Sequence, residues 1–315
     1  MSTALSSLEP TLERLPHPFA RFLLATRPAF LTITLAGCLL GLATSVSDGA
    51  GFDWGRALAT LLLALLAHAG INVLNDYFDH LNGTDACNTQ RIYPYTGGSR
   101  FIQNGVLSPR QVLIFAIVLF ALTIAGGLWL ISIVGSGLFW IGLAGLAIGW
   151  AYSAPPLKLN SRGVGEFCVA MGILLIVPGA DYVQRGAFAP LPWLAGAPYG
   201  LLAANILYIN QFPDRVADRA SGKLHWVARL QPATATWGYA LILLLAALTL
   251  VNEVLLHVLP LAAVVALIAW APAMQAWCQL RRFAATPELL EPAIKRTLLA
   301  AHALPLLLAA ILLLS

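Results

Sequence analysis

The most constraining feature of this chain is a series of long apolar runs that recurs throughout its length. Of the 315 residues, 59% are hydrophobic and only 10% are charged, and the mean hydropathy is +0.79. A soluble domain carries about 25% charged residues, so this composition points to lipid as the solvent. A spanning helix needs roughly 20 mostly apolar residues. With breaks at proline, glycine and charge clusters, the sequence predicts about nine such segments, near residues 20–46, 55–80, 109–132, 135–153, 164–184, 190–212, 234–252, 254–278 and 293–314.

The backbone requirement in lipid narrows the fold class. Only α-helices and closed β-barrels satisfy their backbone hydrogen bonds inside a bilayer, and these runs lack the alternation of barrel strands. We therefore expect an all-α, multi-spanning transmembrane helix bundle with a cytoplasm-facing cap of loops, forming a single domain over residues 1–315. Residues 1–20 include Glu9 and Glu13 and have no apolar core, so we expect a short cytoplasmic lead and no cleaved signal.

The lysines and arginines are distributed asymmetrically about these segments. If the segments are right, one side carries 16 of the 18 cations, and the other carries only Arg56 and Arg185. Because cytoplasmic loops are rich in Lys and Arg, the sequence predicts a multi-pass protein of the inner (cytoplasmic) membrane. The net charge of +4 then implies no nucleic-acid partner. The four cysteines form no CxxC pair, which argues against a disulfide or a zinc site.

Five of the 14 acidic residues fall in two clusters beside predicted spans, where acidic groups are costly and usually functional. In the first cluster, residues 72, 75, 76 and 79 follow the i, i+3, i+4, i+7 pattern. One helix face therefore carries Asn72, Asn75, Asp76 and Asp79. Asp85 follows an Asn-Gly turn and is expected on the next loop.

The second cluster repeats this arrangement in the other half of the chain. Asn210, Asp214 and Asp218 are spaced by four residues and share a helix face. Each cluster closes a predicted span on the cytoplasmic side. Such weak internal symmetry predicts two half-bundles that face each other across a cavity.

The chemistry that fits two opposed carboxylate faces is the binding of a diphosphate through divalent metal ions. Carboxylate and amide oxygens suit Mg²⁺, which keeps several waters and bridges to phosphate oxygens. The metal neutralises charge that grows on a leaving diphosphate. Two other interpretations stay open: ordinary solvated acids at helix ends, and a cation or proton pathway. The predicted metal ligands are Asn75, Asp76, Asp79, Asp85, Asn210, Asp214 and Asp218.

At these residues the chain resembles the UbiA superfamily of intramembrane aromatic prenyltransferases. Asn75, Asp76 and Asp79 match its N-D-x-x-D-x-x-x-D motif, but the last Asp is replaced by Gly83 and an Asp occurs two residues later, at Asp85. This displaced form is similar to the menaquinone-type branch, which prenylates 1,4-dihydroxy-2-naphthoate.

The resemblance extends over roughly residues 20–310. Asp214 and Asp218 match the D-x-x-x-D motif of the family, and Gly222-Lys223 matches its continuation. After that point this chain reads Leu-His-Trp, at residues 224–226, where the family often has Arg-Thr-Leu. Other similar stretches are Arg27-Pro28, 96–109, 152–166 and 179–186.

The resemblance implies Mg²⁺-dependent transfer of a polyprenyl chain from a polyprenyl diphosphate to a small aromatic acceptor in quinone biosynthesis. For a dihydroxynaphthoate acceptor, it implies attack at the carboxyl-bearing carbon with loss of CO₂. Prenylation of 4-hydroxybenzoate, homogentisate or a non-aromatic alcohol remains an alternative. Two alternatives of another class are a cation-coupled transporter and a non-catalytic lipid-binding homologue.

Residue roles follow from this mechanism. We expect Asp79 and Asp214 to be catalytic through the metal, and Tyr152 to stabilise an allylic cation with its ring. Arg27 is expected to contact the acceptor carboxylate. The prenyl tail is expected to leave the bundle laterally, toward membrane lipid. An arginine guanidinium can bind a phosphate through two parallel N–H donors, and a lysine ammonium binds it as a point charge. The predicted diphosphate contacts are Arg100, Lys158, Arg162 and Lys223.

Overall fold

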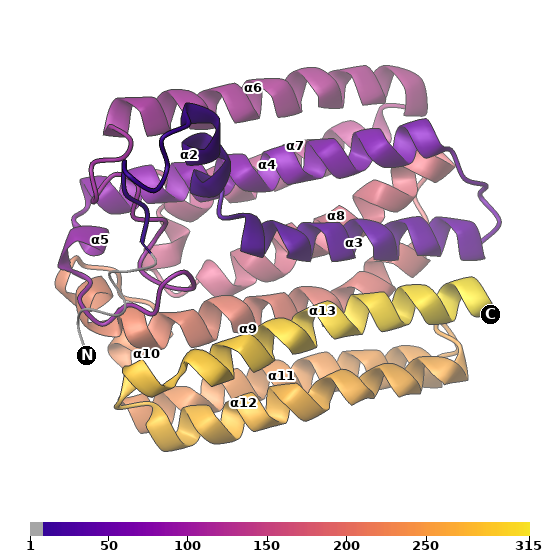
Figure 1. Cartoon of the computed structure of the whole chain (residues 1–315). Coiled ribbons are helices and arrows are strands. Elements are labelled where there is room, and N and C mark those ends of the chain that lie inside the picture. Colours follow the sequence, from indigo (N-terminus) through magenta and orange to yellow (C-terminus); the bar gives the residue numbers. More distant parts are fainter. Residues whose placement is uncertain (1–8) are drawn as a thin grey trace.

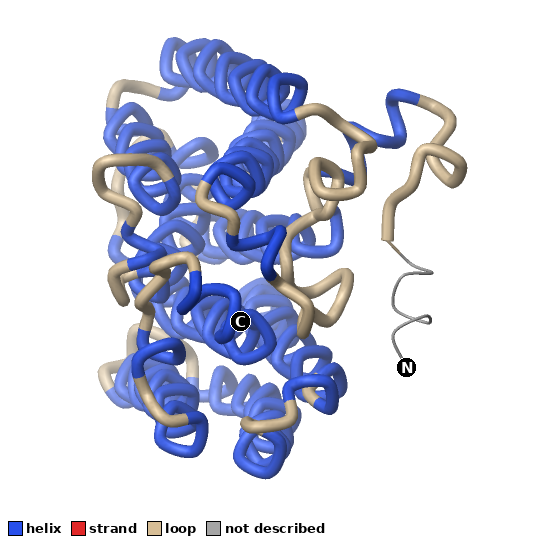
Figure 2. Tube along the Cα trace, turned by 90° about the vertical axis from the view of Figure 1, so that its left-hand side faces the viewer, coloured by secondary structure: helices blue, strands red, loops and turns tan. Residues whose placement is uncertain are grey.

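The computed structural model describes residues 9–315, and every regular element in that range is a helix (Figures 1 and 2). The elements follow one another as α2 (Pro18–Ala25), α3 (Pro28–Ser47), α4 (Trp54–Leu81), α5 (Thr84–Cys87), α6 (Pro109–Val134), α7 (Gly137–Ser153), η1 (Leu159–Ser161), α8 (Gly165–Arg185), α9 (Pro190–Ala220), α10 (Trp226–Arg229), α11 (Pro232–Leu255), η2 (Leu261–Ala269), α12 (Trp270–Phe283), η3 (Pro287–Leu289) and α13 (Glu291–Leu314). The long helices run side by side, and the connecting loops gather at their ends (Figure 2). This confirms the all-α bundle.

Seven segments within residues 9–315 are long and apolar enough to cross a membrane. Two further expected spans do not meet that criterion. Helix α7 is apolar but has only 17 residues, and α9 has 31 residues with prolines at 198 and 213. The multi-pass membrane fold is confirmed, while the number of nine crossings stays a prediction. The seven segments are α3, α4, α6, α8, α11, Leu261–Phe283 and α13.

The first expected segment, residues 20–46, was wrong as one continuous helix. The chain forms α2, breaks at Thr26 and Arg27, and starts α3 at Pro28. Arg27 adopts left-handed backbone angles with φ of 59°. Proline, which lacks a backbone N–H, is favoured at the first position of a helix because an N–H there would have no partner within the helix. The break places the Arg27 side chain at the end of the bundle that carries the acidic clusters.

The opposite end of the bundle is joined by a buried ion pair. Asp181 is buried on α8, and its Oδ1 accepts from Arg185 Nε at 2.7 Å. Its Oδ2 accepts from Thr44 Oγ1 of α3 at 2.9 Å, and Arg185 also donates to Asp48 at 2.9 Å. Arg56 lies beside this group, because its Nη1 reaches the carbonyl of Gln184 at 3.5 Å. The two cations assigned to the outer side are therefore close together at one end.

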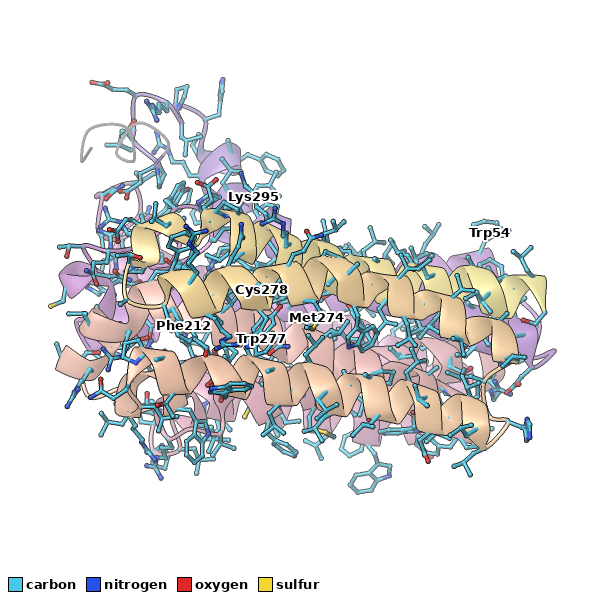
Figure 3. All side chains as sticks on the ribbon, turned by 90° about the horizontal axis from the view of Figure 1, so that it is seen from below. Trp54, Phe212, Met274, Trp277, Cys278 and Lys295 are labelled. Carbon is cyan, nitrogen blue, oxygen red and sulfur yellow. The ribbon has the colours of Figure 1, made fainter. Side chains whose placement is uncertain are left out.

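The short helices and most of the long loops lie at one end of the bundle. Trp54, the first residue of α4, and Lys295, in the first turns of α13, lie far apart along the long axis (Figure 3). The end near Lys295 carries α5, α10 and most of the long loops (Figure 1).

Glycine allows α3, α8 and α9 to pack closely. A Cβ on Gly41 of α3 would lie 2.2 Å from the carbonyl oxygen of Val177 and 2.8 Å from Ala180 Cβ, both on α8. A Cβ on Gly200 of α9 would lie 2.5 Å from the carbonyl oxygen of Ala170. Small residues at such contacts are typical of helix packing in membranes, where dispersion forces drive association. These contacts hold α8 between α3 and α9.

Substitution of Gly41 tests this packing. We expect Gly41→Ala to lower the melting temperature of the detergent-solubilised protein, because α3 must move away from the α8 backbone at a cost of about 1–3 kcal/mol. Gly142→Ala is the matched control, since a Cβ there would meet no heavy atom within 4 Å. Equal melting temperatures for the two variants would contradict the close contact.

Candidate functional site

The two acidic clusters lie at the same end of the bundle and face each other. In the first cluster, Asn72, Asn75, Asp76 and Asp79 occupy the last turns of α4, and Asp85 lies on the short helix α5 and not on a loop as expected. The second cluster occupies the last turns of α9. Lys223, just after α9, bridges them: its Nζ is 2.7 Å from Asp79 Oδ1 and 3.7 Å from Asp218 Oδ1. The turns that follow the two helices also touch, because Thr84 Oγ1 and Ser221 Oγ are 2.6 Å apart. The predicted half-bundles therefore meet across one site.

A cavity of about 200 Å³ separates the two clusters, and we call it the head cavity. Both motifs supply its walls, together with groups that the sequence analysis did not assign to the site. The predicted site residues that line it are Arg27, Asn75, Asp79, Asp85, Tyr152, Asn210, Asp214, Asp218 and Lys223. The additional polar residues are His68, Asn72, Thr84, Asn88, Tyr95, Asn160, Gln211 and His225.

The loop between α5 and α6 covers the carboxylates of both clusters. Asp214 Oδ1 accepts from Asn88 Nδ2 at 2.5 Å, and its Oδ2 accepts from the Gly97 amide at 3.3 Å. Asp76 Oδ1, on the other motif, accepts from the Ser99 amide at 3.3 Å. One loop thus supplies donors to two helices that are far apart in sequence.

The charges in this region are strongly coupled. Burial raises the pKa of the Asp85 carboxyl well above its usual range, and repulsion from Asp79 and Asp76 raises it further. Burial alone would lower the pKa of Lys223, but attraction to Asp79 and Asp218 outweighs burial, so this pKa lies above its usual value. The site is therefore short of positive charge and suits an additional cation.

The donor atoms present fit a hard divalent cation. Asn210 Oδ1, on a residue that lines the head cavity, is buried and has no hydrogen-bond partner. Asp76 Oδ2 is likewise buried without a partner, although Asp76 does not line the cavity. Within residues 9–315, no three His, Cys, Asp or Glu side chains are close enough to hold a metal by themselves. A metal here would therefore take amide oxygens, waters and ligand oxygens as well as carboxylates, which is the coordination that Mg²⁺ prefers.

The predicted diphosphate contacts do not all reach the head cavity. Lys223 lines it, as does Arg27, which was predicted to contact the acceptor carboxylate. Arg100 is buried outside it and donates to the backbone carbonyl of Asp85. Lys158 and Arg162 are exposed on the loop between α7 and α8, where Arg162 Nη2 donates to the Pro156 carbonyl at 2.8 Å. The role of these last three cations at a phosphate stays a prediction.

His225 is a site residue for which the sequence analysis assigned no role. It is buried, and its Nε2 lies 2.9 Å from Asp218 Oδ2. Its Nδ1 accepts from the Ala228 amide at 3.2 Å, so the neutral ring carries its proton on Nε2 and donates it to Asp218. The sequence feature that could have identified His225 was the Leu-His-Trp segment, which departs from the family pattern. The arrangement orients a predicted metal ligand.

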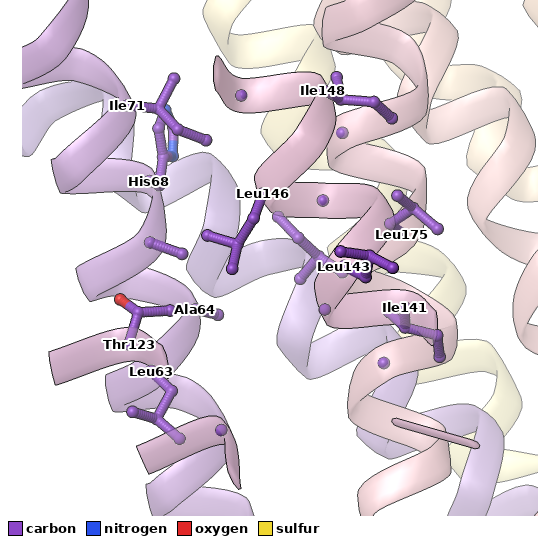
Figure 4. Close-up of a pocket in the computed structure, with 18 of the residues that line it drawn as sticks. Leu63, Ala64, His68, Ile71, Thr123, Ile141, Leu143, Leu146, Ile148 and Leu175 are labelled. Atoms are coloured by element: carbon purple, nitrogen blue, oxygen red, sulfur yellow. The ribbon is translucent and has the colours of Figure 1, made fainter. Parts of the chain in front are cut away.

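A larger apolar cavity of about 570 Å³ adjoins the head cavity, and we call it the tail cavity. Helices α4, α6, α7 and α8 line most of it, and Figure 4 shows His68 among leucine and isoleucine side chains on its walls. The two cavities adjoin each other along a shared wall, because seven residues border both. We call these seven the seam: Arg27, His68, Asn72, Asn75, Tyr152, Val169 and Ile173. The site can therefore hold a molecule with a charged head and an apolar tail.

Comparison with known sequences gives one consistent result. The profile of the UbiA prenyltransferase family matches residues 30–290. The chain is similar to the 1,4-dihydroxy-2-naphthoate octaprenyltransferase of Escherichia coli (strain K12), with 31% identity over 240 residues, 73% of this chain and 76% of that protein. It is also similar to the protein of the same name from Mycobacterium leprae (strain TN), with 27% identity over 68% of this chain and 71% of that protein.

Solved structures share the fold at low sequence identity. A structure described as digeranylgeranylglyceryl phosphate synthase in membranes gives a TM-score of 0.65 at 15% identity, covering 94% of this chain and 99% of that chain. A UbiA homologue from Archaeoglobus fulgidus bound to GPP and Mg²⁺ gives a TM-score of 0.55 at 18% identity, covering 90% and 98%. The helix arrangement described above is therefore shared with both.

Removal of the bridging cation tests the charge balance. We expect Lys223→Met to lower the melting temperature by roughly 5–10 °C in EDTA, because two buried carboxylates lose their counter-charge. Millimolar Mg²⁺ should restore much of this loss, since the ion supplies the missing charge. Lys295→Met is the control, because its pair with Glu291 is exposed and should contribute no measurable stability. No difference between Lys223→Met and the control would contradict the bridge.

Proposed function

This chain belongs to the UbiA prenyltransferase family, and on that premise we propose that it transfers a polyprenyl chain from a polyprenyl diphosphate to 1,4-dihydroxy-2-naphthoate with Mg²⁺ as cofactor. The observation that carries the proposal is that the acid-lined head cavity adjoins the apolar tail cavity along the seven residues of the seam. A polyprenyl diphosphate has these two parts, and each cavity matches one of them.

The head cavity would receive the diphosphate between the two acidic motifs. Asp79 and Asp85 face it from one side, and Asp214 and Asp218 face it from the other. Bound Mg²⁺ would neutralise the charge that grows on the diphosphate as its C–O bond breaks. The Lys223 ammonium, which forms an ion pair with Asp79 in this structure, also lines the head cavity. When the diphosphate is bound, it can pair with a phosphate oxygen instead.

The seam would hold the reacting carbon. When the C–O bond breaks, its electron pair leaves with the diphosphate, and an allylic cation remains. Tyr152 borders both cavities, so its ring can face this cation, an interaction worth about 2 kcal/mol when desolvated. The apolar walls beyond the seam keep water away from the cation.

Arg27 would position the acceptor. Its Nη2 donates to the Tyr95 carbonyl at 3.2 Å, while its Nε is buried without a partner. A carboxylate on the acceptor can take this free donor. The acceptor ring then forms the new C–C bond at its carboxyl-bearing carbon. Loss of CO₂ returns the electron pair to the ring. The relatives named as dihydroxynaphthoate prenyltransferases support this acceptor over 4-hydroxybenzoate.

The membrane orientation follows from the charge asymmetry. Cations gather at the end with the acidic motifs, and Arg56 and Arg185 lie at the other end. By the positive-inside tendency, we place the head cavity at the cytoplasmic face of the inner membrane. The polyprenyl diphosphate would then enter from the surrounding lipid.

Removal of a carboxylate from either motif tests the reaction. We expect Asp79→Ala and Asp214→Ala each to reduce product formation from labelled geranylgeranyl diphosphate and dihydroxynaphthoate by roughly a hundredfold or more, since each removes charge stabilisation of the leaving group. EDTA should do the same to the unaltered protein.

The matched control is Asp48→Ala, which removes an acid from the opposite end of the bundle and should leave turnover unchanged. Full activity in EDTA would eliminate the metal-dependent mechanism. Equal rates with 4-hydroxybenzoate and dihydroxynaphthoate would overturn the acceptor assignment.

Arg27 provides a separate test of the acceptor site. We expect Arg27→Gln to raise KM for dihydroxynaphthoate roughly tenfold or more, because the acceptor carboxylate loses a charged donor. Arg27→Lys keeps the positive charge but loses the paired N–H donors of the guanidinium. Its KM for dihydroxynaphthoate should therefore lie between the values of the unaltered protein and Arg27→Gln. An unchanged acceptor KM with a raised KM for the prenyl diphosphate would reassign Arg27 to the phosphate.

A further inference from the structure

Helix α7 presents three glycines to the tail cavity among larger apolar side chains. On α7, Tyr152, Gly149, Gly145 and Gly142 are spaced by three and four residues and share one face. Glycine inside a helix costs about 1 kcal/mol relative to alanine, so each position calls for a packing or functional reason. Gly149 has a packing reason, because a Cβ there would lie 2.5 Å from Ile71 Cδ1.

Gly145 on α7 and Gly127 on α6 have no such packing reason. Both line the tail cavity and are half-buried, yet a Cβ on either would meet no heavy atom within 4 Å. Their missing side chains therefore leave open volume in the cavity and do not serve close helix contact.

The two glycines lie at different depths from the acidic end. Gly145 is seven residues before Tyr152 of the seam, about 10 Å deeper along α7. Gly126, next to Gly127, lies against Leu63 of α4, which is 12 residues, or about 18 Å, before Asn75 of the seam on that helix. A tail that starts at the seam would therefore pass Gly145 first and Gly127 later.

The deep half of the tail cavity opens sideways. Ile124 and Leu128 of α6 and Phe139 and Leu143 of α7 line the cavity, yet 42–57% of each is exposed. Side chains that are both lining and exposed mark an opening between α6 and α7 on the lipid-facing surface. Gly127, next to Leu128, lies at this opening.

We propose that Gly145 and Gly127 determine which prenyl lengths the protein accepts, an inference that rests on the proposed function. Gly145 keeps the enclosed stretch near the seam wide enough for the first part of the tail. Gly127 keeps the lateral exit open, so a tail longer than the cavity continues into lipid. The donor class that fits this shape is a long-chain polyprenyl diphosphate whose end lies outside the protein.

Two bulky substitutions should cut the accepted length at different points. We expect Gly145→Leu to keep turnover of dimethylallyl diphosphate and to lose on the order of tenfold or more with geranylgeranyl diphosphate. Gly127→Phe should keep both of these donors and lose a similar factor only with octaprenyl diphosphate. Both changes replace glycine with a better helix former, so neither lowers the helix propensity of its segment.

The matched controls add the same bulk outside the cavity. Ala147→Leu on α7 and Ala125→Phe on α6 are exposed positions that do not line the tail cavity, and each should keep the length profile of the unaltered protein. If Gly145→Leu and Gly127→Phe keep that profile too, or lose all donors equally, the length assignment is overturned.

A binding measurement separates this inference from the proposed reaction. Unreactive prenyl thiolodiphosphates of increasing length, added with Mg²⁺, should raise the melting temperature of the unaltered protein more as the tail grows. In Gly145→Leu this increase should stop at the shortest analogues. If the unaltered protein makes no product while Gly145→Leu still loses the length dependence that the unaltered protein shows, the proposed reaction fails and the length assignment stands. Equal length dependence in protein and variant overturns the length assignment even when product forms.

Discussion

Repulsion among carboxylates that share one buried cavity is the constraint on which the rest of this site depends. Asp79 and Asp85 face Asp214 and Asp218 across the head cavity, in surroundings that screen charge poorly. The protein offsets this with the ammonium of Lys223, which touches both motifs, and with donors from the loop before α6. The ends of α4 and α9 can lie this close only because those donors stand between them.

The same requirement explains why the loops at the acidic end of the bundle bond to one another. Beyond Lys223, the Leu224 amide donates to the Ser161 carbonyl at 2.9 Å, and Trp226 Nε1 donates to the Gly163 carbonyl at 2.8 Å. Between them, His225 holds Asp218. The segment that departs from the family pattern thus ties the second motif to the loop between α7 and α8. Its bulky residues are buried or bonded at this junction, so the departure supports the site and does not block it.

Charge and apolar surface meet at the seam, and this junction gives the site its chemistry. A diphosphate is stabilised by cations and hydrogen-bond donors. A prenyl tail is stabilised by apolar walls, and an allylic cation by aromatic rings. Asn75 and Tyr152 stand where these two environments join. The tail cavity is lined mainly by residues of the apolar helices α4, α6, α7 and α8, whereas the head cavity lies among the loops and helix ends that carry the acidic motifs.

The sequence alone determined the class of fold and the two acidic motifs. Lipid leaves a backbone no partner except itself, so apolar runs of this length must become helices, and spacings of three and four place Asn75, Asp79, Asp214 and Asp218 on definite helix faces. Only the tertiary structure decided which groups join them. His68 and His225 enter the site, and Lys158 stays outside it, through contacts between helices and loops that are far apart in the chain. The cavities themselves depend on where side chains are absent, and that is a property of packing between helices, which no local pattern records.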